Sequence, residues 1–474
     1  MVSLKQVTSV TVTSPWSSYN SSSGQTGRGS VVNPSYPIFI FDYQSTAISV
    51  GYVVGSNAGT YQNQADANYL TVPGLYFSVF GYNYWIGGGG ECSVSGCMNN
   101  GINACGPWWA IVDLSSNTLN TYCIGITPNN PVSSHLQNIL ADLVNQNILF
   151  IQNTTSSSYL LIWIIPVSQI SSMLSNTAPS NMKWAYIQSS EGTNQTVYTQ
   201  TGTIYSGNLV YPAWVSTTLY IWVTPLSSIY NNATSGTPSS SSSPVTVGTL
   251  YQIASLSNTT TALATVIGVP SSSGVTVYVS VEAPTGSSGI AVYNISPSNW
   301  SVSNSSTFSL PATILTFVKA TWNGVFLYPG WSGSNVYVMV VDPKTMSMEY
   351  TPTPGAYIMI GAEGYAVVAS QALNSSSVTW TVYQILLDHT YVFQNVSITI
   401  SGSTITATGT LYDLTTNSAV GSVTVWLVAV GSLSDQYSDD VVFITSGTTN
   451  SNGQFSISGS IQTGYTYYGV LYTP

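Results

Sequence analysis

Few side chains in this sequence are suited to acid–base or nucleophilic chemistry. Its 474 residues include 15 Asp and Glu, 5 Lys and Arg and only two histidines, His135 and His389, which lie far apart. A triad of nucleophile, histidine and carboxylate would have to be assembled from distant segments. Histidines that are hydrogen-bonded or lie on the surface are the simpler interpretation. We therefore predict no catalytic residue and no enzymatic activity.

The densest group of carboxylates is in SDQYSDD, which contains Asp435, Asp439 and Asp440. A hard cation needs several oxygen ligands around a tight turn, and this segment has no turn-forming glycine. The stretch IGGGGE, beginning at Ile86, lacks the lysine of a phosphate-binding loop, and no helical pattern follows it. We interpret the first segment as a solvated loop and the second as a flexible turn. No metal and no cofactor are predicted.

All four cysteines, Cys92, Cys97, Cys105 and Cys123, lie in one short Gly-rich window. An even, clustered set with no neighbouring histidine is typical of disulfide bonds. Free thiols and metal ligands are the alternatives. The spacing predicts two disulfides, does not fix their connectivity, and indicates an oxidising, extracellular location.

Candidate glycosylation sequences, Asn-x-Ser or Asn-x-Thr, occur about as often as chance predicts in a chain so rich in these residues. Sugars at these positions would add bulk to a nearly uncharged surface. The 33 Tyr and 13 Trp could stack on sugars, but most lie in strand patterns, where core packing is the simpler interpretation. The candidate sites are Asn20, Asn153, Asn194, Asn232, Asn258, Asn294, Asn299, Asn304, Asn374 and Asn395.

Charge excludes two classes of partner. The net charge is −10 and the isoelectric point is about 4.1, so no basic surface is available for nucleic acid or for an anionic membrane surface. Charged residues make up only 4% of the chain, so few carboxylates exist whose protonation would unfold it. The composition therefore favours an acid-stable protein.

The elements that carry these residues are predicted to be strands. Short β-branched and aromatic runs such as YPIFIF, VTVYVSV and VTVWLVAV are separated by Gly, Ser, Asn and Pro. The exception is SSHLQNILADLV, whose apolar residues recur every three or four positions and predict one short helix. The longest apolar run, Tyr159 to Val167, is too short to span a membrane. The N-terminus lacks the apolar stretch of a secretory signal.

Two phrases are nearly repeated: GNLVYPAWVSTTLYIWVTP from Gly207 and GVFLYPGWSGSNVYVMVVDP from Gly324. A shift of 118 residues also places the segment from Tyr159 over the segment from Val277. A half-period of 59 residues separates Pro166, Pro225, Pro284 and Pro343, each after a strand pattern. We expect a duplicated unit in which Trp214 and Trp331 are equivalent and mostly buried core residues.

These patterns predict an all-β fold of tandem β-sandwich domains, immunoglobulin-like or jelly-roll, with one short helix. The Ser-rich stretch at 235–244 is the expected linker between the two main units. The predicted divisions are an N-terminal arm at 1–30, a disulfide-bearing domain at 31–130, sandwich units at 131–243 and 244–394, and an immunoglobulin-like domain at 395–474. The N-terminal strand KQVTSVTVTS is expected to pair with the sheet of a neighbouring subunit.

The last eighty residues contain a Gly-Thr-Leu strand, a Val-x-Val-x-Leu strand and the hairpin turn Asn452-Gly453. This order resembles the immunoglobulin-like modules of the Cna-B or transthyretin-like type. The resemblance implies a stalk, spacer or adhesion module without catalysis.

In domain build and composition the chain also resembles turret, spike and capsid-surface structural proteins of archaeal viruses from hot acid springs. The resemblance implies an extracellular virion-surface glycoprotein that assembles with copies of itself and with other virion or surface-layer proteins, and that contacts host-surface glycans. A carbohydrate-binding adhesin, a pilus, thread or S-layer-associated cell-surface protein, and a secreted acid hydrolase are the alternatives.

Overall fold

The structure is a computed structural model of the whole chain. It describes the residues 1–13, 29–33, 38–43, 49–54, 57–62, 75–77, 84–91, 107–113, 118–123, 136–153, 158–174, 179–197, 201–236, 242–256, 263–282, 289–314, 320–333, 335–361, 364–371, 375–434 and 440–473.

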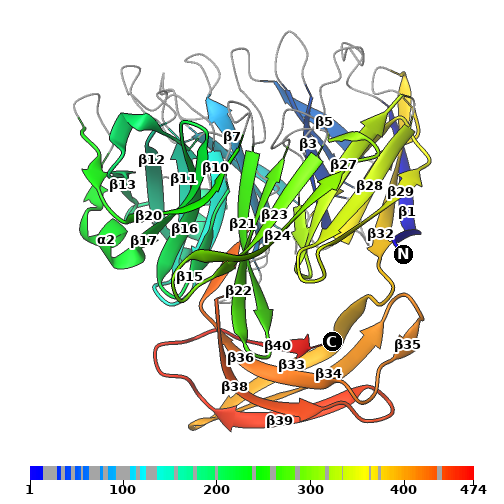
Figure 1. Cartoon of the computed structure of the whole chain (residues 1–474). Coiled ribbons are helices and arrows are strands. Elements are labelled where there is room, and N and C mark those ends of the chain that lie inside the picture. The colour runs from blue at the N-terminus through cyan, green and yellow to red at the C-terminus, as the bar shows by residue number, and fades with distance from the viewer. Residues whose placement is uncertain are drawn as a thin grey trace.

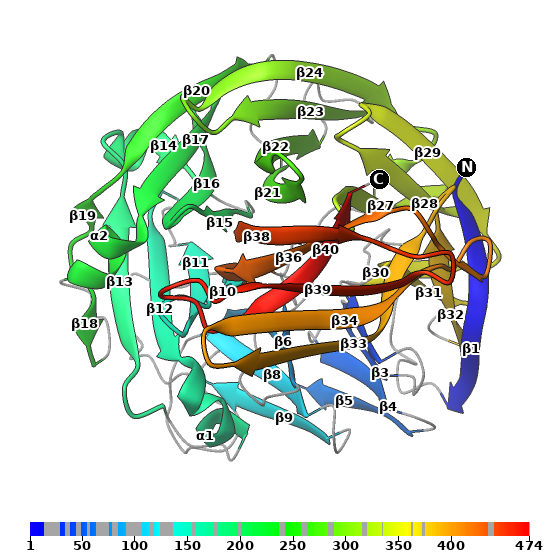
Figure 2. The ribbon, with the colours of Figure 1, turned by 90° about the horizontal axis from the view of Figure 1, so that it is seen from below.

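Nine sheets are formed by the described residues, antiparallel except where β19 pairs with β13, and seven of them stand around a common axis (Figures 1 and 2). In most of them, consecutive strands of the chain pair as neighbours. The first three sheets along the chain contain β2 (Gly29–Asn33), β3 (Ile38–Tyr43), β4 (Ser49–Val54) and β5 (Asn57–Gln62); β6 (Leu75–Phe77), β7 (Tyr84–Glu91), β8 (Pro107–Asp113) and β9 (Thr118–Cys123); and β10 (Leu136–Asp142), β11 (Asn147–Asn153), β12 (Leu160–Pro166) and β13 (Lys183–Gln188).

The next two sheets follow the same plan. The first of them also receives the short strands β14 (Gln195–Thr196) and β15 (Thr203–Tyr205), which both pair with β16. These sheets contain β16 (Asn208–Val215), β17 (Thr218–Pro225) and β20 (Thr249–Ser255); and β21 (Leu263–Ser271), β22 (Gly274–Glu282), β23 (Gly289–Ser296) and β24 (Ser301–Ser309). The short strands β18 (Thr234–Ser235) and β19 (Val245–Thr246) pair with β13.

The last two sheets complete the ring. They contain β25 (Thr313–Ile314), β26 (Ala320–Trp322), β27 (Val325–Ser332), β28 (Asn335–Asp342) and β29 (Ser347–Thr353); and β30 (Tyr357–Gly361), β31 (Tyr365–Ala369), β32 (Ser377–Leu386) and β1 (Ser3–Thr13). Radial sheets repeated around an axis define a β-propeller, here with seven blades among the described residues.

The N-terminal strand closes the ring within its own chain. Strand β1 pairs with β32 from Ser3 opposite Leu386 to Thr13 opposite Ser377, with one bulge between Gln6 and Thr8. The prediction that this strand pairs with a neighbouring subunit is therefore wrong. The sheet edge with which β1 pairs is that of β32, in the same chain and more than 360 residues away in sequence.

The hydrophobic core is divided among the spaces between neighbouring blades. Each strand alternates its side chains between two faces, and in the middle of the ring both faces are buried. For β28, Val336, Val338 and Val340 pack toward the blade of β30–β32, whereas Met339 and Val341 pack toward the blade of β21–β24. This burial on both sides explains strands that are apolar at nearly every position, such as LLIWIIP in β12.

A two-layer β-sandwich formed by the C-terminal residues lies below the ring (Figure 1). Ile405, Leu427 and Phe455 are buried between its layers. One layer contains β33 (Tyr391–Ser401), β34 (Thr404–Asp413), β35 (Ser418–Ala419) and β39 (Gln454–Ser460), and the other contains β36 (Thr424–Val430), β38 (Val441–Thr448) and β40 (Tyr468–Thr473).

The sandwich is continuous with the propeller. Strand β37 (Ser432–Ser434), which follows β36, pairs with the inner edge of β10. Val428 and Val430 of β36 share a core with Phe150 and Trp163 of the β10–β13 blade. The C-terminal region is thus joined to the ring by both backbone hydrogen bonds and a common core.

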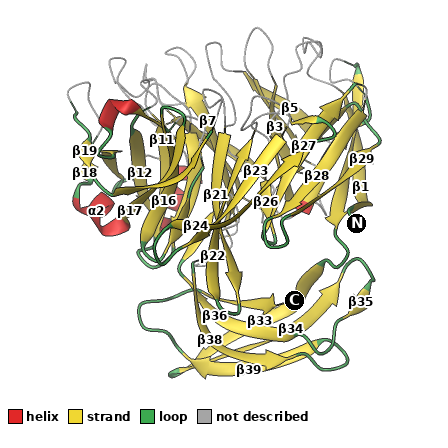
Figure 3. Cartoon of the chain, viewed as in Figure 1, coloured by secondary structure: helices red, strands yellow, loops and turns green. Residues whose placement is uncertain are grey.

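Helices are few and lie at the rim of the blades (Figure 3). The described residues form α1 (Ile170–Leu174), α2 (Leu226–Asn231) and the 3-10 turns η2 (Val167–Gln169) and η3 (Gly192–Asn194). The helix predicted around Leu136 to Leu143 is wrong, because this segment is strand β10. Its apolar residues at mixed spacing reflect burial on both faces, with Ile139, Leu140 and Ala141 all inaccessible. No helix of the described residues is long and apolar enough to cross a membrane.

The all-β prediction is confirmed, but a ring of single sheets does not confirm tandem immunoglobulin-like or jelly-roll sandwiches. The predicted boundary at 243 and 244 falls inside one blade, since β17 and β20 pair across it. The boundary at 30 and 31 falls inside β2, and that at 394 and 395 inside β33. The boundary at 130 and 131 lies outside the described residues.

The sequence repeat corresponds to the blade. The two Tyr-Pro phrases form β16 with β17 and β27 with β28, the second and third main strands of blades that are two positions apart in the ring. Each phrase begins at a tight turn with positive φ, at Ser206-Gly207 and Asn323-Gly324. A period of 59 residues is therefore one blade, and 118 residues is two. Pro284 does not occupy the position of the other three prolines. In the sequence it follows β22, the second strand of its blade, and the residue itself lies outside the described residues.

Trp214 and Trp331 occupy the same hairpin position but different environments. Trp214 lies opposite Leu219 and Trp331 opposite Val336. The exposed fraction is 3% for Trp214 and 45% for Trp331, so the prediction that both are mostly buried is wrong for Trp331.

Replacing these two tryptophans by alanine should give unequal losses of stability. Trp214→Ala leaves a cavity between two blades and should lower the free energy of unfolding by about 3–5 kcal/mol. Trp331→Ala should cost less than about 1 kcal/mol. Guanidinium unfolding of the two variants, followed by far-UV circular dichroism, measures the difference. Equal losses would contradict the assignment of Trp214 alone to the core.

Candidate functional site

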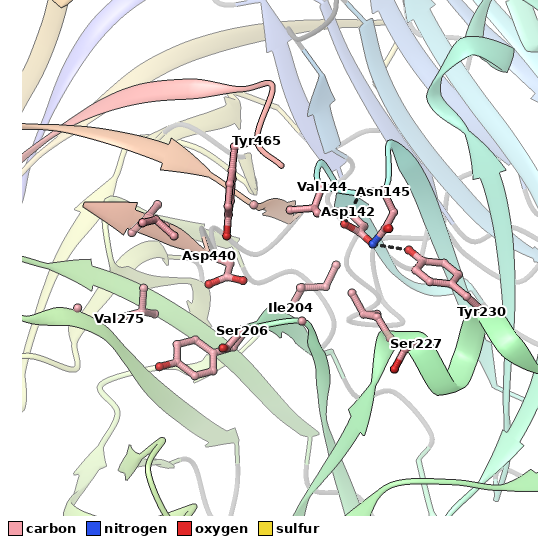
Figure 4. A pocket seen from close by; sticks show the side chains of 17 residues that line it. Asp142, Val144, Asn145, Ile204, Ser206, Ser227, Tyr230, Val275, Asp440 and Tyr465 are labelled. Atoms are coloured by element: carbon pink, nitrogen blue, oxygen red, sulfur yellow. Dashed lines mark hydrogen bonds between the residues drawn. The ribbon is translucent and has the colours of Figure 1, made fainter. Parts of the chain in front are cut away.

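A pocket of about 520 Å³ lies where the blades of β10–β13, β14–β20 and β21–β24 meet the C-terminal region (Figure 4). Its floor includes the apolar side chains of Ile204, Leu226 and Val275, and its polar side chains are two carboxylates, three tyrosines, two serines and one asparagine. The full lining is Asp142, Val144, Asn145, Ile204, Tyr205, Ser206, Gly207, Leu226, Ser227, Tyr230, Gly274, Val275, Gly431, Asp440, Val441, Val442 and Tyr465.

Asp142 is the last residue of β10 and is 2% exposed. The backbone N–H of Asn145 donates to its Oδ1 at 3.1 Å, and the side-chain Nδ2 of Asn145 donates to its Oδ2 at 2.7 Å. The hydroxyl of Tyr230 also donates to Oδ2. A buried carboxylate needs such donors to offset its lost hydration, so the turn after β10 and helix α2 together fix its orientation.

Tyr230 is brought to Asp142 by helix α2. Pro225 ends β17 and is the N-cap of this helix, and the backbone N–H of Leu226 donates to the carbonyl of Gly207 at 2.9 Å. Burial and the adjacent Asp142 carboxylate raise the pKa of Tyr230, because both disfavour the phenolate. Tyr230 therefore stays a neutral donor at all ordinary pH values.

Asp440 enters the pocket from the C-terminal region, just before β38. Its carboxylate accepts hydrogen bonds from the backbone N–H groups of Ser206 and Gly207, at the β15–β16 turn. Its own backbone N–H donates to Ser432 Oγ at 3.1 Å. The hairpin turn, with φ of 47° at Ser206 and 71° at Gly207, points successive N–H groups at the carboxylate.

Burial raises the pKa of Asp440 to about 6, and the nearby negative charge of Asp142 adds to the increase. The hydrogen bonds from Ser206 and Gly207 act in the opposite direction but are outweighed. Asp142 and Asp440 face the pocket from either side of Ile204 (Figure 4). Two carboxylates thus share one partly desolvated space.

Aromatic rings complete the walls. Burial, followed by the charge of Asp440, raises the pKa of both Tyr205 and Tyr465, so both hydroxyls remain protonated. The edge of the Tyr205 ring also meets Trp300, with ring centroids 5.9 Å apart. Among the described residues that line this pocket, none is Lys, Arg or His. This described lining therefore presents negative charge and π-faces without a counter-ion of its own, which suits a cation.

A second polar cluster lies where the chain passes from β32 to β33. Asp413 is 2% exposed at its side chain, and its Oδ2 lies 2.9 Å from Nδ1 of His389. The backbone N–H groups of Thr390 and Thr415 donate to its Oδ1 at 3.0 and 2.9 Å. Burial acts to raise the pKa of Asp413, but these hydrogen bonds, that of His389 first, lower it to about 2. The cluster fixes the connection between propeller and sandwich.

Asp413→Asn should destabilise the sandwich at neutral pH. A carboxyl whose folded pKa is below its unfolded value, 3.8, stabilises the fold above pH 4 and loses this contribution as pH falls toward 2. The expected loss at pH 7 is about 2 kcal/mol. Thermal unfolding from pH 2 to pH 7 measures it, with Glu191→Gln as a charge-matched control. A constant difference between variant and wild type across this range would contradict the linkage.

Most of the site residues predicted from sequence are placed elsewhere or fall outside the described residues. Cys92, Cys97, Cys105, His135, Asp435 and Asp439 lie outside them, and Cys123 ends β9 with its side chain undescribed. The two disulfides thus remain a prediction. Of the acidic cluster only Asp440 is described, and it lines the pocket rather than a solvated loop. Of the glycosylation candidates, Asn194, Asn232, Asn299, Asn304 and Asn395 are exposed, Asn294 is half-buried, and Asn20, Asn153, Asn258 and Asn374 are not described at their side chains.

Sequence reasoning missed Asp142, Tyr230 and Tyr465. Asp142 was assigned to a helix, which hid its position at the end of a strand. The Asp142–Tyr230 contact joins residues 88 positions apart, and no local pattern connects them.

The described residues define a class of fold, a seven-bladed propeller with a C-terminal sandwich. Comparison with known proteins assigns the chain to no family. No family model and no curated protein matches the chain. Among solved structures, the WD40 domain of coronin from Toxoplasma gondii is 7% identical, with a TM-score of 0.42 over 81% of this chain and 85% of that one. The WD40 domain of SCAP from fission yeast is 6% identical, with a TM-score of 0.38 over 73% of this chain and 81% of that one.

The fold corrects the predicted resemblances. The blades form a ring rather than the tandem sandwich domains on which the resemblance to virion turret, spike or capsid-surface proteins depended, so that resemblance is wrong. The functions that it implied, and the adhesin and acid hydrolase alternatives, are not supported. The resemblance of the C-terminal region to a Cna-B or transthyretin-like immunoglobulin module is also wrong. That region does not stand apart as a module, because β37 pairs with the propeller and β36 shares its core.

Proposed function

We propose that this chain is a non-catalytic scaffold that binds another protein through the pocket between propeller and sandwich, and that it works outside the cell. The observation that carries the proposal is the composition of the pocket: three tyrosines and two carboxylates around an apolar floor, contributed by three blades and the C-terminal region. Tyrosine-rich pockets with a few oriented polar groups are typical of binding sites. The extracellular location follows from the clustered cysteines.

The hydrogen bonds of the two carboxylates favour binding over catalysis. Asp142 accepts three hydrogen bonds, from Asn145 twice and from Tyr230, so these groups occupy most of its lone-pair sites. Asp440 is likewise held by the backbone of the β15–β16 turn. A nucleophile or general base needs a lone pair directed at the substrate. Fixed charges of this kind serve instead to position a partner group.

The rigidity of the surroundings supports the same proposal. The walls are strand ends and one helix anchored by the Leu226–Gly207 hydrogen bond. The C-terminal wall is tied to the propeller by the backbone N–H of Leu143, which donates to the carbonyl of Gly431 at 2.9 Å. A preformed pocket loses little entropy on binding, which favours affinity.

Selection of linear peptides from a random display library on the immobilised full-length chain tests this function. Peptides that bind should lose at least about tenfold in affinity for Ser227→Trp, which places a ring in the pocket from an exposed position. Ser303→Trp, on the exposed strand β24, is the matched control and should bind normally.

Two results would reject the scaffold. One is the absence of any selected peptide that distinguishes Ser227→Trp from the wild type. The other is cleavage of bound peptides, detected by mass spectrometry after prolonged incubation, because the proposal requires that ligands leave unchanged.

A further inference from the structure

We infer that the pocket receives the cationic head of a lysine or arginine side chain from the bound protein, between Asp142 and Asp440. This inference rests on the proposed function and adds the chemistry of the anchor residue. The expected occupant is a protein side chain and not a free ion. The experiments below distinguish it from a metal ion and from a neutral apolar side chain.

Charge complementarity is the first argument. Asp142 and Asp440 line one pocket, and no other lining residue that the structure describes is cationic. Asp142 is almost wholly removed from water, and Asp440 is half-buried. Carboxylates in a partly desolvated space attract a cation more strongly than the same groups in water, because the effective dielectric constant is lower. An incoming ammonium or guanidinium group supplies a counter-ion that the described lining does not contain.

The shape of the lining is the second argument. Lysine and arginine have long apolar stems with a charged end, and such side chains bury their stems along apolar surface. Here Ile204 lies between the two carboxylates and offers that surface (Figure 4). Leu226 and Val275 also line the pocket. A compact metal ion would leave this apolar floor uncovered. The volume of about 520 Å³ lies within the range of ordinary ligand sites.

The tyrosines are the third argument. Tyr205 and Tyr465 remain neutral. The charge of Asp440 contributes to the raised pKa of both, which places both hydroxyls close to this carboxylate. The face of an aromatic ring attracts a cation within about 6 Å of its centroid. A cationic head beside Asp440 would thus gain from the carboxylate and from neighbouring rings together. The Tyr230 hydroxyl keeps the Asp142 carboxylate in place on the opposite side.

The test uses the full-length chain and the peptides selected against it. Each peptide is resynthesised with its lysines replaced by norleucine, which keeps the apolar stem without the ammonium group, or its arginines by citrulline, which removes the charge and keeps the length. We expect one position per peptide at which the replacement weakens binding at least about tenfold. Asp440→Asn and Asp142→Asn should weaken the charged peptide to a similar extent and leave the neutral peptide almost unchanged. Glu191→Gln, which removes a negative charge outside this pocket, should not matter.

The outcomes separate the inference from the function on which it rests. If peptides bind, and Ser227→Trp blocks them, but neutral replacements bind equally well, the cationic anchor is wrong and the scaffold stands. If no peptide binds, the scaffold itself fails. Should Asp142→Asn misfold, Asp440→Asn and the peptide series still decide.

Small probes distinguish the remaining occupants. Saturation-transfer NMR with Nα-acetyl-lysine amide should show contact of the side-chain methylenes with the wild type, and none with Ser227→Trp. Calcium chloride at millimolar concentration should not displace this probe. Displacement by Ca²⁺ would overturn the inference in favour of a metal site, and contact by Nα-acetyl-norleucine amide of equal strength would reduce it to a neutral apolar pocket.

Discussion

Deletion of residues 1–13 should open the propeller and abolish its cooperative unfolding. Strand β1 forms the outer edge of the last blade and pairs with β32 along nearly its whole length. The deletion also removes the buried side chains of Val2 and Val12. Without it, the hydrogen-bonding edge of β32 is exposed, and exposed edges pair with other chains. We expect the truncated protein to aggregate or to unfold at a much lower temperature, measured by calorimetry and size-exclusion chromatography.

Adding the missing strand in trans provides the control. A synthetic peptide of residues 1–13 should bind the truncated chain as an added strand and restore its thermal midpoint in a concentration-dependent way. A scrambled peptide of the same composition should not. A truncated chain that stays monomeric with the midpoint of the full-length protein would show that β1 contributes nothing to closure.

The same strand shows why the ring was not predictable from sequence. The short aromatic and β-branched runs predict strands, and the 59-residue spacing of Pro166, Pro225 and Pro343 marks the ends of equivalent third strands. Both observations are local. Whether sheets stack in pairs or close into a ring depends on contacts such as that of β1 with β32, which no local pattern contains. A repeat unit of one sheet was thus interpreted as part of a sandwich.

Strand β10 shows a second limit. Its apolar residues Leu136, Ile139, Leu140 and Leu143 have helical spacing, but both faces of this inner strand are buried and so no alternation of polar and apolar residues is required. The amide Asn138 is buried as well, and its Oδ1 accepts the backbone N–H of Gly202 at 2.6 Å. The spacing of apolar residues does not distinguish a helix from a strand that is buried on both faces. Because β10 was predicted to be a helix, Asp142 at its end was not predicted to be a site residue.

The pocket illustrates a different difficulty. Asp440 was visible in the sequence as part of an acidic segment, but Asp142 and Tyr230 are ordinary residues until the fold brings them together. Burial, followed by the charge of Asp142, raises the pKa of Asp440, and the backbone N–H groups of Ser206 and Gly207 oppose the increase; these groups lie more than 200 residues away in sequence. The chemistry of such a site belongs to the tertiary structure alone.

Binding of the charged peptides should weaken roughly tenfold between pH 7.5 and pH 5. Asp440 has a pKa raised to about 6, so most molecules lose its negative charge over this interval. Asp440→Asn should bind weakly at both pH values, so its affinity should not depend on pH. Fluorescence anisotropy of labelled peptides measures the affinity at each pH. Citrulline-substituted or norleucine-substituted peptides are the control and should show little change.

As pH falls, the stability of the unbound chain should increase while its affinity for charged peptides decreases. Opposite changes in these two quantities are expected only if Asp440 is the titrating group. Because the folded pKa of Asp440 exceeds its unfolded value of 3.8, the folded state binds a proton more tightly between pH 4 and pH 6. The free protein therefore gains stability as pH falls through this window, while the complex loses affinity. Asp440→Asn should be more stable than wild type at pH 7 and equal to it near pH 4. If peptide affinity and protein stability both decrease as pH falls, acid destabilises the protein as a whole. Asp440 is then not the group that binds the cation.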